Sequence, residues 1–176
     1  MRRLPPRKLD PNYVAPMLTL NQGKDRVVEM FGARDYTLKE IEKKLKKRLE
    51  PQLMKELLEW VAVQSWFPTE ENMTEQFVRA LGRRKKGQNY INQKLKAAGL
   101  KSVKISAEVE LEKALELLKV KWDETEFQGL GFKELQKQKA KVIRFLAGRG
   151  FNLSTASQAY NSYFKTGKVD NYDEEY

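Results

Sequence analysis

Apolar side chains recur at helical spacing through most of the chain. Leu38, Ile41 and Leu45 stand at positions i, i+3 and i+7, which places them on one face of an α-helix. Comparable spacing recurs at Leu53–Leu57–Val61, Met73–Phe77–Leu81, Leu111–Leu115–Leu118, Leu135–Val142–Leu146 and Leu153–Ala156–Tyr160–Tyr163. No segment alternates with a period of two residues beside a hairpin-turn signal. The pattern predicts an all-α protein with no sheet.

Polar residues at the expected helix starts agree with this fold class. Thr37 and Glu40 have the Thr-x-x-Glu spacing of a capping box, in which each side chain satisfies a backbone N–H that the helix leaves free. Ser106 precedes Glu108, and this order suits a helix N-terminus because hydroxyls cap it and carboxylates favour its positive end. We therefore expect helices to begin after Thr37 and after Ser106.

A unit of two helices joined by an arginine-bearing turn recurs three times. The turns lie at 31–37, at 81–87 and, in a weaker copy, at 146–152. Two short helices cannot bury their apolar faces alone, so neighbouring units must stack to form a core. We expect an elongated array of about three tandem three-helix modules; a single irregular helical bundle is the alternative. The expected divisions are a flexible Pro-rich basic arm (1–22), module 1 (23–68), a basic module 2 (69–121), module 3 with a degenerate first helix (122–166), and an acidic tail (167–176).

The composition argues against most catalytic chemistry. The chain has no cysteine and no histidine, which excludes disulfides, thiolate nucleophiles, Cys/His zinc sites and histidine-dependent triads. The two Gly-x-Gly pieces, at 129–131 and 148–150, lack a third glycine and a preceding strand, so they do not indicate nucleotide binding. The paired carboxylates Glu70–Glu71 and the acidic stretch 173–175 are interpreted as solvated groups. We expect a protein that is not an enzyme and holds no metal and no cofactor.

The chain also lacks the signals of a membrane protein. Its most apolar stretch, residues 57–63, is far shorter than a membrane span. The basic start of the chain has no apolar segment after it, so it does not resemble a secretory signal. We expect a cytoplasmic protein without membrane contact, and nothing in the sequence demands more than a monomer.

Charge is strongly segregated along the sequence. Lys and Arg number 34 against 24 Asp and Glu, a net charge of +10. No acidic residue occurs between Gln76 and Ala107, whereas nine cations do, and a second basic stretch at 133–149 is opposed by Glu134 alone. The candidate binding residues are Arg79, Arg83, Arg84, Lys85, Lys86, Lys94, Lys96, Lys141, Arg144 and Arg149.

Two interpretations of these cations stand side by side. A charge run is usually a solvated surface, but an acid-free segment of this length favours an anionic partner such as DNA or RNA. Tyr36 and Tyr90 are either exposed anchors for a partner or residues that pack between helices. The tryptophans at 60, 66 and 122 are interpreted as core residues rather than as base-stacking platforms.

Three strings in the sequence resemble the RecX family of bacterial regulatory proteins. They are Thr37-x-x-Glu40-Ile41-x-x-Lys44-Leu45, the segment from Phe77-Val78 through Arg83-Arg84-Lys85-Lys86-Gly87 to Leu95 and Gly99, and Lys141-x-x-x-Phe145-Leu146-x-x-Arg149-Gly150-Phe151. Their order and spacing carry the resemblance, which spans about residues 23–165. The chain departs from the family at 65–71, where Ser-Trp-Phe-Pro-Thr-Glu-Glu replaces the usual Gly-Tyr-Leu-Asp-Asp, and at Gln88, where a proline often stands.

The resemblance implies a function that the charge pattern does not specify. It implies a regulator that binds the RecA recombinase and its filament on DNA, and modulates strand exchange and ATP hydrolysis, with inhibition as the expected direction. The corresponding setting is homologous recombination, DNA repair and the SOS response. A general nucleic-acid-binding helical protein, such as a DNA or RNA chaperone, is the alternative, and an adaptor for another acidic protein is a third class.

Overall fold

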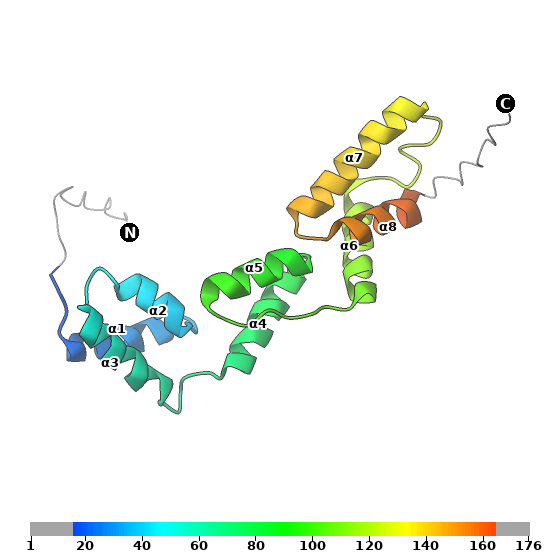
Figure 1. Ribbon diagram of the computed structural model, residues 1–176. Coiled ribbons are helices and arrows are strands. Elements are labelled where there is room, and N and C mark those ends of the chain that lie inside the picture. The colour runs from blue at the N-terminus through cyan, green and yellow to red at the C-terminus, as the bar shows by residue number, and fades with distance from the viewer. Residues whose placement is uncertain (1–15, 165–176) are drawn as a thin grey trace, which may run out of the picture. The chain divides into compact units, whose positions relative to one another are not determined.

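A computed structural model describes residues 16–164 of the chain (Figure 1). The acidic tail expected at 167–176 and most of the arm expected at 1–22 lie outside the described residues. Within them the chain forms eight helices and no strand, so the predicted all-α class is confirmed. In chain order the helices are α1 (Leu20–Phe31), α2 (Leu38–Leu45), α3 (Pro51–Ala62), α4 (Glu70–Arg83), α5 (Gln88–Ala98), α6 (Ala107–Lys121), α7 (Phe132–Gly148) and α8 (Leu153–Phe164).

Side-chain caps set most of the helix starts. Thr37 and Glu40 form the predicted capping box, with Thr37 Oγ1 accepting from the Glu40 amide at 3.2 Å and Glu40 Oε2 accepting from the Thr37 amide at 3.1 Å. Ser106 caps α6 as predicted by accepting from the Val109 amide. Thr69 caps α4 in the same way. These bonds satisfy amides that have no partner inside the helix.

The first helix begins earlier than the expected end of the arm. Thr19 and Gln22 form a second capping box, so α1 starts at Leu20 and the arm cannot extend to residue 22. Gly23 is buried, and a Cβ there would lie 3.2 Å from a Leu49 methyl group. The expected arm was too long because its prolines end at Pro16 and a Thr-x-x-Gln cap follows them.

The chain divides into two compact units, residues 1–68 and 69–176. The first unit holds α1, α2 and α3, which surround one core (Figure 1). The buried residues of that core are Val27, Met30, Tyr36, Ile41, Leu45, Leu49, Met54, Leu57 and Val61. The stripe predicted from Leu38 to Leu49 supplies much of it.

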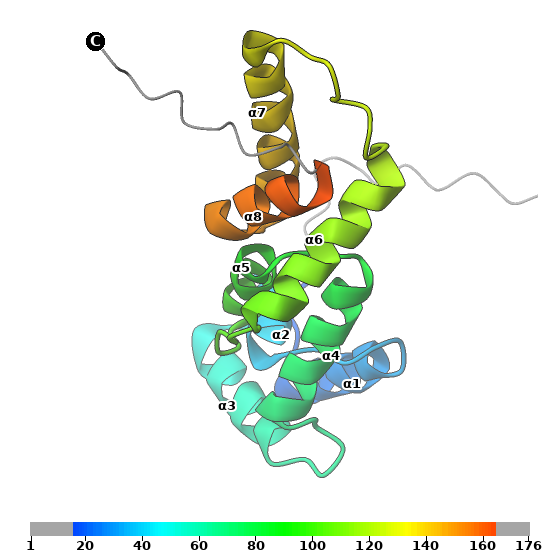
Figure 2. The same cartoon turned by 90° about the vertical axis from the view of Figure 1, so that its right-hand side faces the viewer.

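The second unit holds α4 to α8. Helices α4 and α5 pack as a pair, and α8 crosses both α6 and α7 (Figure 2). The core shared by α6, α7 and α8 includes Leu118, Val142, Leu146 and Tyr160, together with Trp122 and Phe127 from the turns that precede α7. Residues 122–131, the start of the expected module 3, form no helix. Leu153, expected on a buried stripe, is exposed.

Helix α6 shares its core with the helices that follow it in sequence. It lies within the expected module 2, yet its buried residues Ala114, Leu117 and Leu118 belong to the α6–α8 core. The division into three modules therefore stays a prediction, and α6 is the element that links the second expected module to the third. No helix among the described residues is long and apolar enough to cross a membrane.

Candidate nucleic-acid interface

The acid-free segment runs from α4 through α5 to the loop before α6. Arg79 and Arg83 are exposed on α4 and lie one turn apart, and Arg84 is exposed just after the helix ends. None of the three forms an ion pair with a carboxylate among residues 16–164. Their charges are therefore uncompensated at short range, which is the condition that favours an anionic ligand.

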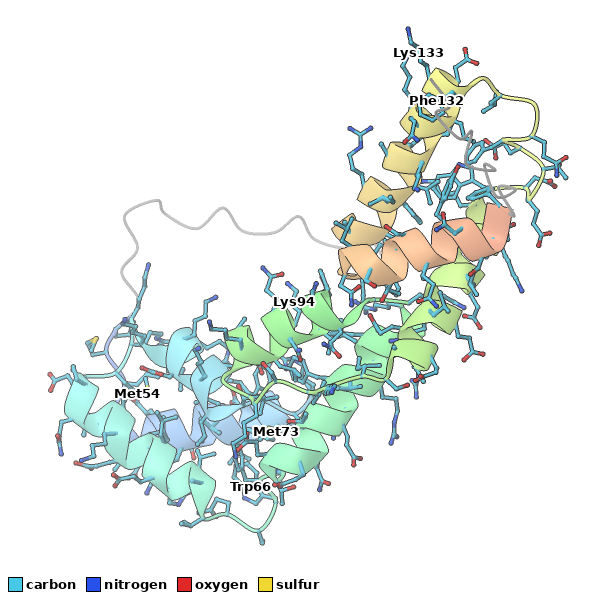
Figure 3. All side chains as sticks on the ribbon, turned by 45° about the vertical axis from the view of Figure 1, so that its right-hand side comes forward. Met54, Trp66, Met73, Lys94, Phe132 and Lys133 are labelled. Atoms are coloured by element: carbon cyan, nitrogen blue, oxygen red, sulfur yellow. The ribbon has the colours of Figure 1, made fainter. Side chains whose placement is uncertain are left out.

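Helix α5 carries a row of two lysines with a tyrosine between them. Lys86, Tyr90 and Lys94 are four residues apart, so they lie on one side of the helix and the turn before it. The ammonium nitrogens of Lys86 and Lys94 lie 4.5 Å and 5.3 Å from the centroid of the Tyr90 ring. Lys94 projects outward from α5 (Figure 3). Lys96 is also exposed on this helix.

Lys85 differs from the other candidate cations. Its φ of 51° places it in the left-handed region, where it ends α4 as a glycine often does. Its ammonium group pairs with the Glu116 carboxylate on α6. Lys85 thus ties two elements together, and its charge is compensated within the protein.

Two glycines hold the turn before α5 against the turn after α7. The Gly87 amide donates to the Arg149 carbonyl and the Asn89 amide to the Gly150 carbonyl, each at 3.0 Å. A Cβ at Gly87 would lie 2.4 Å from the carbonyl carbon of Gly150, so only glycine fits this backbone contact. The contact brings Arg149 of the second basic stretch beside the start of α5. The repeated turns were visible in the sequence, but their pairing was not.

The remaining candidates lie on α7 and directly after its last residue. Lys141 and Arg144 are exposed, about two turns and just over one turn before Arg149. The Arg149 guanidinium lies 5.0 Å from the Phe145 ring centroid, and the Lys121 ammonium lies 4.0 Å from the same centroid. Lys141, Arg144 and Arg149 form no ion pair with a carboxylate of the described residues. The second basic stretch is therefore also uncompensated.

A buried carboxylate positions α5, and no local pattern in the sequence predicts it. Glu110 of α6 is 3% exposed; its Oε2 accepts from the Gln88 amide at 2.9 Å and its Oε1 accepts from Lys113 at 2.7 Å. Gln88 is the first residue of α5, so the carboxylate sits at the positive end of that helix. Asn92 adds two side-chain bonds to the backbone of Val103, at 2.9 and 3.0 Å. These contacts fix α5 against the loop and α6.

The aromatic residues divide into core and surface. Tyr36 is 9% exposed and lies in the core of the first unit, so the interpretation as an exposed anchor is wrong and the packing interpretation is right. Trp122 is buried, as expected of a core residue. Trp66 is 41% exposed although it contacts Phe31 and Trp60 edge-on. Tyr90 is half-buried.

The carboxylates of the described residues do not gather as metal ligands do. Among these residues no group of three or more Asp, Glu, His or Cys side chains lies close enough to hold an ion. Glu70 instead faces Lys101, with 3.6 Å between the ammonium nitrogen and the carboxylate oxygen. The acidic stretch 173–175 lies outside the described residues.

Comparison with known proteins finds likeness at the level of the fold. No protein-family model matches the sequence, and no curated protein matches it. Among solved structures, the crystal structure of regulatory protein RecX is similar, with a TM-score of 0.59 and 18% sequence identity. The match covers 84% of this chain and 72% of that one.

Proposed function

We propose that this protein binds the RecA recombinase on its DNA filament and modulates, in the expected direction of inhibition, strand exchange and ATP hydrolysis. The observation that carries the proposal is the fold-level likeness to regulatory protein RecX over most of the chain. The sequence strings that resemble that family, which lie on α2, α4–α5 and α7, support it independently. In this proposal the protein acts by binding within the filament. It is a cytoplasmic monomer that catalyses no reaction and needs no cofactor.

The proposed interface comprises the candidate cations on and beside α4, α5 and α7. A RecA filament on DNA is a polyanionic assembly, so cations without carboxylate partners would gain most from contact with it. Lys85 remains in the proposed set because of its position, although its pairing with Glu116 predicts that it contributes least. The acid-free segment by itself also favours the second candidate function, general binding of DNA or RNA.

A reconstituted reaction tests the proposal. Strand exchange and the single-strand-dependent ATPase of the cognate RecA are measured with increasing amounts of this protein. We expect both rates to change, and to fall, as the protein approaches the amount of RecA. Unchanged rates at equal amounts would reject the proposal.

A binding comparison separates the two candidate functions. Affinity for bare single-stranded DNA is compared with affinity for the same strand coated by RecA, at one salt concentration. Preference for the coated strand supports the filament regulator. Tight binding to bare strands combined with indifference to RecA supports the general nucleic-acid-binding protein, and binding to neither points to the adaptor class.

Charge-matched variants test the interface. Replacing Arg79, Arg83 and Arg84 by alanine is compared with replacing Lys43, Lys46 and Lys47, three exposed lysines of the first unit. The slope of log K against log salt is negative. If each arginine neutralises one phosphate, the first variant makes this slope shallower by about 2 to 3, and the second variant leaves it near the wild-type value. Equal effects of the two variants would assign binding to net charge alone.

A further inference from the structure

The ring of Tyr90 is held at the surface of the second unit by a rigid support. Tyr90 lies in the first turn of α5 and is half-buried. A Cβ at Gly150 would lie 2.4 Å from the Tyr90 Cβ, so the backbone of the 149–150 turn closes one side of the residue. Two backbone bonds from Gly87 and Asn89 to that turn fix the same segment. The tyrosine is therefore positioned before any ligand arrives.

The two lysines beside this ring have no carboxylate partner among the described residues, unlike the arginine beside the Tyr36 ring. At Tyr36 the Arg34 guanidinium lies 3.7 Å from the ring centroid and is held there by Glu40, at 3.0 Å. That pairing raises the pKa of Arg34, and the ring is buried. At Tyr90 neither lysine pairs with a carboxylate of the described residues. Long lysine stems can therefore move from the ring to a ligand's phosphates.

We infer that Tyr90 stacks against an unpaired base of a single-stranded nucleic acid while Lys86 and Lys94 bind the phosphates on either side. An aromatic face combined with a cationic track is the usual means of holding single strands without sequence preference. A duplex fits less well because its base faces are covered by neighbouring bases. An acidic protein segment would satisfy the lysines but would gain nothing from the ring face. This strand contact deepens the proposed function and rests on it for its biological setting.

Fluorescence of a labelled strand, without RecA, tests the contact. The probe is an oligothymidine of about a dozen nucleotides with 2-aminopurine at its centre, whose emission is quenched by stacking. We expect quenching on binding, loss of quenching with Tyr90→Ala, and retention of quenching with Tyr90→Phe. Affinity should fall about 5- to 150-fold in the alanine variant, the range for one base stacked on one aromatic ring. Circular dichroism checks that both variants stay helical.

Paired variants and ligands separate stacking from charge. The double variant Lys86→Ala, Lys94→Ala should make the negative slope of log K against log salt shallower by about 1.4, while the saturated complex stays quenched. The control Lys43→Ala, Lys46→Ala, in the first unit, should change neither the salt slope nor the quenching. The inference is overturned if Tyr90→Ala binds and quenches like the wild type, or if a duplex of the same length or a polyglutamate competes as well as the single strand. Because the fluorescence assay contains no RecA, its failure would not affect the outcome of the strand-exchange assay. Failure of the strand-exchange assay would likewise leave the fluorescence result valid.

Discussion

At the scale of single residues, Gly150 carries a constraint that can be measured. Its φ of 93° costs an L-amino acid about 1–2 kcal/mol, and an added Cβ would collide with Tyr90. We expect Gly150→Ala to lower the free energy of unfolding by about 2 kcal/mol or more in urea titrations. Gly148→Ala is the control, because it lies in α7 with no atom near the added methyl, and it should raise stability by about 0.5–1 kcal/mol. Equal stabilities of the two variants would show that the turns do not pack as described.

Two buried tyrosines of α8 form a second matched pair. The Tyr163 hydroxyl donates to the Trp122 carbonyl at 2.6 Å, whereas the Tyr160 hydroxyl is buried without a hydrogen-bond partner among the described residues. Tyr163→Phe should cost about 0.5–1.5 kcal/mol, and Tyr160→Phe should be neutral or stabilising by about 1 kcal/mol. Thermal denaturation of both variants measures the difference. A larger loss for Tyr160→Phe would mean that its hydroxyl has a partner.

The same tyrosines predict how stability depends on alkaline pH. Burial raises the pKa of both phenols. The folded state therefore keeps protons that the unfolded state releases, so this contribution is complete below the ordinary tyrosine pKa of about 10 and is lost as pH rises above it. Unfolding free energies measured from pH 9 upward should fall less steeply for the double phenylalanine variant than for the wild type. Parallel curves would contradict the expectation.

Individual residues also show which properties can be predicted from neighbouring residues in the sequence and which cannot. The cap at Thr37 was predicted because both partners lie within four positions of each other. Lys85 could not be recognised as a helix-ending residue, since its left-handed backbone and its pairing with Glu116, 31 positions away, are not local properties of an Arg-Arg-Lys-Lys run. Tyr36 was left open for the same reason, because burial depends on residues brought in by folding.

At the scale of elements, Glu110 determines where α5 begins. It accepts from the first amide of α5 and from Lys113, and both side chains are largely buried. Breaking such a pair leaves an uncompensated cation and an unsatisfied amide, so Glu110→Ala should cost about 3 kcal/mol or more. The exposed Glu112, on the same helix, is the control, and Glu112→Ala should change stability by no more than about 0.5 kcal/mol.

Amide exchange adds a readout for this element. Relative to the wild type, Glu110→Ala should accelerate exchange of the Gln88 amide more than exchange of the amides in the middle of α7. Uniform acceleration throughout the second unit would mean that Glu110 stabilises the unit as a whole and does not anchor α5 in particular.

The starts of helices could be predicted from local sequence better than the packing partners of helices could. The starts of α2 and α6 were predicted from hydroxyl and carboxylate spacing. Helix α6 was expected to complete module 2, yet its buried face lies in the core with α7 and α8. Its sequence offers apolar residues on several sides, so periodicity alone does not say which neighbour it covers.

At the scale of the whole molecule, the described residues form two main cores that share no side chain. The first is built from α1 to α3 and the second from α6 to α8 and the turns before α7. The all-α class was predictable because it depends on the period of the apolar residues. Which helices share the core of the second unit was not predictable, since it depends on which helices meet.

Separate cores predict separate unfolding. Leu57 and Leu118 are both fully buried, one in each core, and truncating either to alanine should cost about 2–5 kcal/mol. Leu57→Ala should accelerate hydrogen exchange in α1 to α3 and leave α6 to α8 protected, and Leu118→Ala should do the reverse, because a cavity weakens only the residues that pack around it. If either variant exposes both sets of helices together, the two units unfold as one cooperative body. The proposed interface on α4, α5 and α7 would then depend on the stability of both units. If each variant exposes its own set, Leu57→Ala destabilises the first unit and leaves the proposed interface intact. Its effect on the activity of RecA then measures what an intact first unit contributes.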